Sequence, residues 1–394
     1  MKALQFSRKP LQYAASYVAG SVSPGKGAAY GPLKLKDLDP PHLPGDGWVR
    51  IKPRLAGICG SDLATIDGRS SRYFEHIVSF PFVPGHEVVA DTDDGRRVVV
   101  EPVLGCVARG INPVCQSCAA GHLGNCERLA FGQIDAGLQS GFCCDTGGGW
   151  STSMVAHRSQ LHDVPDALSD EDAVMIEPTA CAVHGALRAR VPDGGLVVVL
   201  GAGTLGLLTI AALRAFTNAG TILAAARYPL QRTLAAELGA DVVCETGEVS
   251  RWVRRLSSSL AYGEQLTGGA DSVIDCVGDE STIAHALSIV RPRGRVTLVG
   301  MPSNVKLSLT TLWHRETEIV GAYAYGIESL ADGTSPRTFD LAAQLVASAQ
   351  LGRLVSALYP LRDYKVALEH AATAGRRGAV KVAFDLRAEK ERNR

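Results

Sequence analysis

The chain has 394 residues, with 40 lysines and arginines against 40 aspartates and glutamates, so its formal net charge is zero. Hydrophobic residues make up 46% and charged residues 20%, a composition that excludes general disorder. This balance gives no long-range attraction to nucleic acid or anionic lipid, and we expect neither as a partner. The length indicates two domains, each large enough to bury its own core.

No apolar run reaches the roughly 18 residues that a membrane-spanning helix needs. The first ten residues, MKALQFSRKP, lack the apolar segment of a signal peptide. We therefore expect a soluble, cytoplasmic protein. In that reducing compartment, the ten cysteines favour metal binding over disulfides.

The first 100 residues are predicted to be all-β. Short runs such as 48–52 and 97–100 alternate with segments rich in Pro and Gly, at a spacing typical of a barrel or sandwich. Residues 104–150 are rich in Gly and Cys and have little periodicity. This indicates an irregular lobe followed by a long loop.

The pattern changes near residue 186. An unbroken apolar run at 195–200 is typical of a strand buried on both faces. Helical stretches then alternate with short strands, which indicates a parallel sheet covered by helices. The further strands expected are 221–225, 242–243, 272–275 and 295–299. A helix at 339–349 leads to a closing β segment at 379–386, and the charged tail 387–394 is expected to fray.

A G-x-G-x-x-G sequence at 201–206 follows the first buried strand and opens an apolar helix at 207–216. A dinucleotide-binding βαβ unit requires this context. Gly201 would permit the tight turn, Gly203 the close approach of a pyrophosphate, and Gly206 the packing of helix on strand. The pyrophosphate would lie against the helix N-terminus, where free N–H groups favour negative charge. A glycine-rich turn without a ligand is the alternative.

The end of the second strand indicates which nicotinamide cofactor binds. An Asp or Glu at this place would bind the ribose hydroxyls of NAD. Here the strand ends in Ala226 and Arg227, and a guanidinium pairs with the 2′-phosphate of NADP. We expect NADP to be preferred. The alternative is that Arg227 is solvated and the site accepts NAD.

Four cysteines crowd into one short segment. They are Cys106, Cys115, Cys118 and Cys126. Four thiolates within one loop fit a closed tetrahedral zinc site, which stabilises its lobe and takes no part in the chemistry. Four buried free thiols are the alternative.

A second set of candidate metal ligands is dispersed along the chain. Cys59 lies in G-I-C-G-S-D, His86 in G-H-E, and Glu177 in I-E-P, seven residues before His184. Cys, His and Glu as three ligands leave a fourth position open, which is the pattern of a catalytic zinc. A histidine such as His86 taken alone is more often a core or surface residue.

Taken in order, these motifs resemble those of the zinc-containing medium-chain alcohol dehydrogenase family, which includes sorbitol and threonine dehydrogenases. The resemblance covers residues 30–386. It implies a GroES-like, β-rich catalytic domain formed by 1–185 and 326–394. It also implies a cofactor domain at 186–325 with a doubly wound parallel sheet, the Rossmann fold.

The resemblance implies the ligands of the catalytic zinc. Cys59 and His86 match the first two, and Glu177 stands where family members carry the third. Glu87 is the rival for that place. If residues 86 and 87 are extended, their side chains point to opposite sides, which favours Glu177.

The resemblance also implies a proton path. Asp62 matches a carboxylate that orients the zinc-binding histidine, and Ser61 matches the hydroxyl that passes on the proton of the alcohol. The chain departs from many family members at Ala64, where they carry a histidine as the next proton carrier. The path beyond Ser61 would then use a cofactor ribose hydroxyl, water or another side chain.

Two further departures concern the chain between the motifs. Eight residues separate Cys106 from Cys115, where two are usual, although a longer variant of the family also carries R-G-x-x-P here. Residues 64–84 are longer than in compact members, and 136–150 form an unfamiliar loop. Both segments could border the substrate, so the resemblance does not name the substrate.

Together these features predict an oxidoreductase with two zinc ions per chain that transfers a hydride between NAD(P) and an alcohol, carbonyl or imine. Alternatives are a biosynthetic reductase of a specialised intermediate, a non-catalytic nucleotide-binding member and a zinc-bearing nucleic-acid-binding protein. The family suggests a homodimer or homotetramer. The expected cofactor-binding residues are Gly201, Gly203, Thr204, Leu205, Gly206, Ala226, Arg227, Val277 and Val299.

Overall fold

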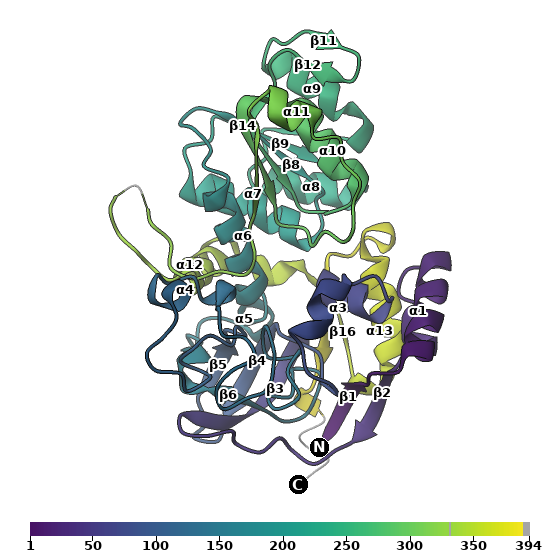
Figure 1. Ribbon diagram of the computed structural model, residues 1–394, viewed down its shortest axis with the longest axis vertical. Helices are drawn as coiled ribbons and strands as arrows, with labels where there is room; N and C mark the ends of the chain where they lie inside the picture. Colours follow the sequence, from purple (N-terminus) through teal and green to yellow (C-terminus); the bar gives the residue numbers. More distant parts are fainter. Residues whose placement is uncertain (331, 389–394) are drawn as a thin grey trace. The chain divides into compact units, whose positions relative to one another are not determined.

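The computed structural model describes residues 1–330 and 332–388 and shows two compact units (Figure 1). Unit 1 comprises Met1–Glu177 together with Gln350–Arg394. Unit 2 comprises Pro178–Ala349. Unit 1 is therefore assembled from both ends of the chain, and unit 2 from its middle.

The two boundaries expected from the sequence, after residue 185 and after residue 325, both fall inside unit 2. The first lies within helix α6 (Ile176–Arg188), which is continuous across it. Helix α12 (Thr338–Ala349) lies beyond the second and packs against helix α7 (Thr204–Phe216) of the same unit. The contacts of α12 therefore keep it with unit 2.

Unit 1 is built around a seven-stranded sheet and a separate two-stranded one. Its strands are β1 (Lys2–Phe6), β2 (Leu33–Asp37), β3 (Trp48–Gly57), β4 (Val88–Thr92), β5 (Arg97–Val100), β6 (Met154–His157), β7 (Leu161–Asp163), β16 (Val355–Tyr359) and β17 (Lys381–Asp385). The larger sheet runs β16-β17-β3-β4-β5-β7, with β6 also paired to β3. Its pairs are antiparallel except β16–β17. Strands β1 and β2 form the antiparallel pair.

Unit 1 also contains helices, most of them short. They are α1 (Pro10–Val22), α2 (Gly27–Tyr30), α3 (Gly60–Ile66), α4 (Gln116–Ala119), α5 (Asp170–Ala173) and α13 (Tyr364–Ala372), with 3₁₀ turns at Arg72–His76, Leu123–Asn125, Arg158–Gln160, Leu351–Leu354, Leu361–Asp363 and Ala374–Arg377.

The prediction that the first 100 residues are all-β is wrong, because α1, α2 and α3 fall among them. Helix α1 begins at Pro10, a residue suited to a first helical turn. Its outer face carries Leu11, Val18 and Val22, all exposed. The helix therefore lacks the polar outer stripe by which surface helices are recognised. Of the charged tail 387–394, residues 389–394 lie outside the described part.

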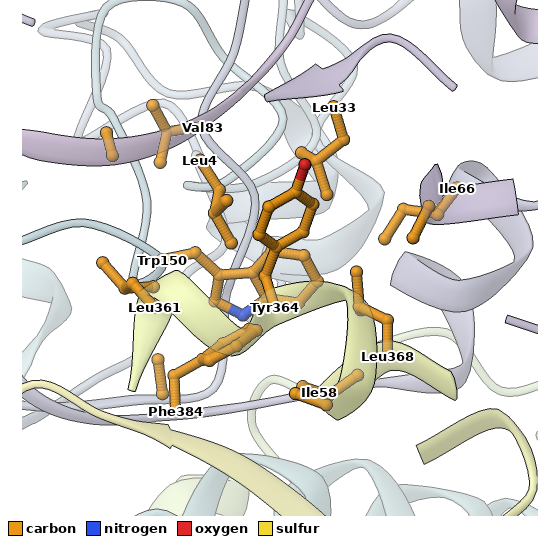
Figure 2. Close-up of a cluster of buried hydrophobic side chains, with 14 of the residues drawn as sticks. Leu4, Leu33, Ile58, Ile66, Val83, Trp150, Leu361, Tyr364, Leu368 and Phe384 are labelled. Atoms are coloured by element: carbon orange, nitrogen blue, oxygen red, sulfur yellow. The ribbon is translucent and has the colours of Figure 1, made fainter. Parts of the chain in front are cut away.

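The main core of unit 1 joins distant parts of the chain (Figure 2). The rings of Trp150 and Phe384 meet edge to face with centroids 5.1 Å apart. The indole N–H of Trp150 donates a hydrogen bond to the carbonyl of Gly57 at 3.1 Å. The loop 136–150 is therefore anchored to the end of β3, two residues before Cys59.

Unit 2 contains a six-stranded sheet whose pairs are all parallel. Its strands are β8 (Leu196–Leu200), β9 (Thr221–Ala225), β10 (Val242–Cys244), β13 (Ala270–Asp275), β14 (Val290–Leu298) and β15 (Glu318–Gly321), and a small hairpin is formed by β11 (Ala261–Tyr262) and β12 (Gln265–Leu266). The order β10-β9-β8-β13-β14-β15 is doubly wound and reverses between β8 and β13. Ligands of such sheets bind at the carboxyl ends of the strands at that reversal.

Helices connect the strands of unit 2 as the alternating sequence pattern predicted. Besides α6, α7 and α12 they are α8 (Pro229–Glu237), α9 (Val249–Leu256), α10 (Glu280–Ile289) and α11 (Thr310–His314), with a 3₁₀ turn at Thr246–Glu248. Val197, Val198 and Val199 of β8 are fully buried, as its unbroken apolar run predicted. Within residues 1–330 and 332–388, no helix is long and apolar enough to cross a membrane.

Candidate functional site

Three candidate metal ligands converge in unit 1. The thiol of Cys59, a ring nitrogen of His86 and a carboxylate oxygen of Glu87 all lie within 4.8 Å of one another. Cys59 follows β3 and is the N-cap residue of α3. His86 and Glu87 lead into β4, which pairs antiparallel with β3. The pairing of these two strands therefore brings the three residues together.

The carboxylate of Asp62 is buried between two of these residues. One oxygen lies 3.5 Å from Nδ1 of His86, and the other accepts the backbone N–H of Cys59 at 3.0 Å. Burial by itself would lower the pKa of His86, but Asp62 and Cys59 outweigh it and raise that pKa well above its usual value. The set offers sulfur, nitrogen and oxygen donors, which fits a divalent zinc ion.

Glu87 also forms a buried ion pair with the ammonium group of Lys381 on β17. The side chains of Lys381 and Glu87 are 3% and 1% exposed, so neither charge is solvated. Lys381 additionally donates a hydrogen bond to the carbonyl of Ile58 at 3.3 Å. Burial by itself would lower the pKa of Lys381, but nearby negative charges, above all Glu87, raise it.

A glycine makes room for this ion pair. A Cβ atom at Gly57 would lie 1.8 Å from a carboxylate oxygen of Glu87. Sequence reasoning missed Lys381, although a charged residue inside the apolar run Val380–Phe384 is a signal of a buried partner.

Glu177 lies in the first turn of α6 and is buried. Among the described residues its carboxylate is not part of the set within 4.8 Å, whereas that of Glu87 is. The argument against Glu87 assumed an extended chain at His86 and Glu87, but the backbone bends at Glu87 just before β4. The negative charge of Glu177 contributes to the raised pKa of Lys381.

Ser61 is half-buried in the first turn of α3, two residues beyond Cys59. Its carbonyl accepts the hydroxyl of Thr65 at 2.9 Å. The next turn carries Ala64, so α3 places no imidazole after Ser61. On another side of the site, the rings of His86 and Phe142 lie with centroids 5.8 Å apart. The loop 136–150 thus contributes a wall beside the candidate zinc ligand.

The four clustered cysteines do converge. The sulfur atoms of Cys106, Cys115, Cys118 and Cys126 all lie within 4.8 Å of one another. Backbone N–H groups donate to these sulfurs, as from Cys115 to Cys106 at 3.3 Å. Burial would raise the pKa of Cys115, but hydrogen bonds from Cys118 and Glu127 lower it to about 7. Four thiols at this spacing fit a tetrahedral zinc ion.

A buried arginine organises the same lobe. Arg109 is fully buried, and its guanidinium donates hydrogen bonds of 2.7–3.2 Å to five backbone carbonyls: Leu104, Phe131, Ile134, Asp135 and Gly137. An unpaired buried charge would cost several kcal/mol, and these acceptors offset that cost. The sequence showed Arg109 only as part of a spacer between cysteines. Its role depends on carbonyls that follow it by more than twenty residues in four of the five cases.

In unit 2 the glycine-rich sequence forms the turn between β8 and α7. Gly201 has φ of +89°, which favours glycine. Gly203 caps α7, and Thr204 and Leu205 form its first turn. A Cβ atom at Gly206 would lie 1.8 Å from the carbonyl oxygen of Gly201, so helix and strand approach too closely for any other residue. The free N–H groups of α7 suit a pyrophosphate.

A second buried carboxylate shapes the neighbouring strand ends. Asp275, at the end of β13, accepts the backbone N–H groups of Val277 at 2.9 Å and Gly278 at 3.2 Å. Its own carbonyl accepts the N–H of Val299 at 2.9 Å. Val277 lies over Gly201, where a Cβ atom would approach it to 2.5 Å. The sequence reasoning did not single out Asp275.

At the end of β9, Ala226 is buried and Arg227 is exposed. Within the described residues, the Arg227 side chain has no hydrogen bond or ion pair. Arg232, one turn into α8, donates to the carbonyl of Arg227 at 3.1 Å and pairs with Glu245 at 3.3 Å. Two guanidinium groups therefore flank this strand end, and no carboxylate occupies the position expected of an NAD-binding residue.

His184 has a defined partner as well. Its Nδ1 lies 2.7 Å from a carboxylate oxygen of Glu328, which also accepts the hydroxyl of Thr338 at 2.8 Å. Burial would raise the pKa of Glu328, but these contacts with His184 and Thr338 lower it. Glu328, which lies before α12, therefore connects His184 of α6 to Thr338 at the start of α12.

Known proteins are similar to this chain in sequence and in fold. Residues 204–348 match the family described as zinc-binding dehydrogenase, and residues 45–166 match the alcohol dehydrogenase GroES-like domain. The chain is 30% identical to sorbitol dehydrogenase of Bacillus subtilis over 325 residues, 76% of this chain and 83% of that protein. It is 29% identical to L-idonate 5-dehydrogenase of Vitis vinifera, covering 90% of this chain and 93% of that protein.

Solved structures show the same fold. The alcohol dehydrogenase of Thermus sp. ATN1 matches with a TM-score of 0.71 at 24% identity, covering 98% of this chain and 99% of that chain. The acetophenone reductase of Geotrichum candidum in complex with NAD matches with a TM-score of 0.72 at 20% identity, covering 98% of each chain.

The fold and the two family matches define a zinc-binding dehydrogenase. More closely, the chain belongs to the zinc-dependent medium-chain alcohol dehydrogenase family. It is an NAD(P)-dependent zinc oxidoreductase that acts on alcohols and carbonyl compounds.

Proposed function

We propose that this enzyme interconverts secondary hydroxyl groups of polyols or sugar acids with the corresponding ketones, with NADP(H) as the preferred cofactor. The observation that supports the zinc chemistry is the convergence of the Cys59 thiol with the buried side chains of His86 and Glu87, all within 4.8 Å of one another. The substrate class rests on the curated relatives, which include sorbitol dehydrogenase, L-idonate 5-dehydrogenase and the probable D-xylulose reductase A of Aspergillus fumigatus. The compounds in these names, sorbitol, L-idonate and D-xylulose, all have a polyhydroxylated carbon chain.

Cys59, His86 and Glu177 would hold the catalytic zinc, which supplies Lewis acidity toward the substrate oxygen while the nicotinamide exchanges the hydride. Glu177 is preferred as the third ligand because the charge of Glu87 is already matched by Lys381. Zinc content of Glu177→Gln and Glu87→Gln separates the two assignments. We expect the Glu177 variant to lose one zinc per chain and the Glu87 variant to retain it; the reverse result assigns Glu87.

The side chains around these ligands have separate tasks. Asp62 holds the ring of His86 in place, and Lys381 neutralises Glu87. Ser61 relays the proton of the substrate hydroxyl: during oxidation its oxygen accepts that proton as its own hydroxyl proton passes on, and the transfers reverse during reduction. Because Ala64 follows it, the proton then leaves through a ribose hydroxyl of the cofactor or through water.

The residues at the end of β9 support the proposed preference for NADP(H). Arg227 is free to pair with a 2′-phosphate, and the buried methyl group of Ala226 neither binds a ribose diol nor repels a phosphate. The proposal further includes a second, structural zinc on Cys106, Cys115, Cys118 and Cys126, and a homodimer or homotetramer in the cytoplasm.

The test is a steady-state panel with sorbitol, L-idonate and xylitol as alcohols and D-xylulose as ketone, each with NADP(H) and NAD(H). We expect turnover of at least one of these compounds, with ethanol and other simple primary alcohols at least tenfold poorer in kcat/KM. Turnover confined to simple alcohols would contradict the polyol proposal. A zinc-loaded, folded protein that turns over nothing would contradict the proposed residue roles.

A further inference from the structure

A cavity of about 880 Å³ opens in unit 2, away from the glycine-rich turn. It lies between α9, the β11–β12 hairpin and α10, with residues 307–311 on a further side (Figure 1). None of the residues expected to bind the dinucleotide lines it. Its volume lies within the range of small-molecule sites, roughly 300–1,000 Å³.

Small side chains on α10 create this space. Ser281, Ala284 and Ser288 recur at helical spacing, so they lie on one face of the helix and line the cavity. Leu266 of the hairpin and Leu287 of α10 are buried beneath it. The site therefore has an apolar floor and a polar wall, the usual character of a small-ligand site.

The opposite wall, on α9, is cationic. Arg251 and Arg254 line the cavity one turn apart. Arg251 pairs with Glu248 at 2.5 Å. Within residues 1–330 and 332–388, the side chain of Arg254 makes no hydrogen bond or ion pair. Glu264 on the hairpin brings a carboxylate to the lining. Because Glu248 is paired with Arg251, Arg254 is the guanidinium group available to an anionic ligand.

Two neutral groups complete the hydrogen-bonding surface. Ser250 on α9 and Nε2 of His285 on α10 lie 2.9 Å apart and join the two helices across the cavity. Burial lowers the pKa of His285, so its ring is neutral near pH 7. The side-chain oxygen of Gln265 is buried and has no hydrogen-bond partner within the described residues.

We propose that this cavity binds a small organic phosphate. Arg254, with Arg251 beside it, takes the phosphate, because a guanidinium binds phosphate oxygens through two parallel hydrogen bonds. The amide NH₂ group of Gln265, which also lines the cavity, donates to a hydroxyl group of the ligand. The carbon skeleton lies on Leu266 and Leu287. The site is separate from the one that binds the dinucleotide, and the proposal does not rest on the substrate proposed above.

The test is isothermal titration calorimetry of the whole protein with glycerol 3-phosphate as probe. A saturating dinucleotide (NADPH, with NADH in a repeat) is present throughout, because the glycine-rich turn would otherwise bind the phosphate. We expect saturable binding of one molecule per chain and no binding of glycerol alone. Arg254→Gln should weaken binding by about ten- to a hundredfold, the effect of losing a charge-assisted hydrogen bond.

Arg255→Gln is the matched control. Arg255 neighbours Arg254 on the same helix, but its guanidinium lies over the ring of Trp252 at 5.7 Å and does not line the cavity. The control removes the same charge and should leave the affinity unchanged. Equal losses in both variants, or no saturable binding to the unaltered protein, overturn the proposal.

A second variant tests the location without changing any charge. Ala284 is exposed at the mouth of the cavity, so Ala284→Trp fills the space while the protein keeps its fold. This variant should abolish binding of glycerol 3-phosphate. Binding that survives in Ala284→Trp would place the phosphate elsewhere and overturn the assignment to this cavity.

Discussion

Replacing Lys381 with methionine tests the buried ion pair beside the candidate zinc ligands. The substitution keeps an unbranched side chain, one atom shorter, and removes its charge, which leaves the carboxylate of Glu87 buried without its cation. Removing one partner of a buried pair typically costs about 3–5 kcal/mol, because the other charge remains desolvated. For domains of this size a loss of 1 kcal/mol lowers Tm by roughly 2–4 °C. We therefore expect Tm to fall by about 6–20 °C.

The assay is thermal unfolding followed by circular dichroism, with zinc content measured on the same samples. Lys52→Met is the control, because Lys52 pairs with Asp93 at 3.0 Å on the same unit but both side chains are more than half exposed. An exposed pair contributes about 0–1 kcal/mol. The double variant Lys381→Met with Glu87→Gln removes both charges and should recover most of the lost stability.

One result would refute this reasoning. If Lys381→Met is no more destabilising than Lys52→Met and zinc content is unchanged, the charge of Glu87 is balanced by something other than Lys381. Glu87 would then itself be the third zinc ligand, and Glu177 would lose that role.

The remaining predictions concern zinc, the proton, the cofactor and pH. Elemental analysis should find about two zinc ions per chain. Cys59→Ala should lose one zinc and turnover yet stay folded, whereas Cys118→Ala should mainly lose stability. Equal losses of stability in the two variants would contradict separate roles for the two zinc sites. Ser61→Ala should lower turnover by roughly 10²–10⁴-fold with zinc unchanged; activity within a few-fold of the unaltered enzyme would exclude Ser61 from the proton path. The unaltered enzyme should prefer NADPH to NADH about ten- to a hundredfold in kcat/KM. Arg227→Ala should erase most of this preference by weakening NADPH binding. A preference of the unaltered enzyme for NADH would contradict the proposed cofactor. Because the pKa of Glu328 is lowered in the fold, its stabilisation is present above the unfolded value near 4.5 and is lost as pH falls through the folded value. Glu328→Gln should therefore cost about 1–3 kcal/mol in urea unfolding at pH 7 and progressively less below pH 4.5, and a loss independent of pH would contradict this assignment.

Much of unit 2 was predictable because its signals are local. The turn between β8 and α7 depends on glycines within six residues. Gly201 has a positive φ, and a Cβ atom at Gly206 would meet the carbonyl oxygen of Gly201. The apolar run of β8 and the alternation of strands and helices likewise show in short windows. The doubly wound parallel sheet and the nicotinamide cofactor are confirmed.

Unit 1 was harder to predict because its structure depends on contacts between residues far apart in the sequence. Helix α1 carries apolar residues on its exposed face, so its sequence lacks the pattern of a surface helix. The unfamiliar loop 136–150 contributes Trp150 to the main core, through a hydrogen bond to Gly57 that spans 93 residues of sequence. Such contacts leave no periodic trace in the sequence.

By itself, the sequence determined the family, the two kinds of domain and the residues that are candidates for both zinc sites. It could do so because short motifs encode glycine turns, thiol clusters and capped helices through neighbours in the chain. Only the tertiary structure showed that Glu87 joins Cys59 and His86, and that Lys381 lies beside them. Lys381 is 323 residues from Ile58, whose carbonyl it contacts, and only the pairing of β17 with β3 brings the two segments together. The ligand set of a metal centre depends on distances and charges in three dimensions, and spacing along the chain does not determine these.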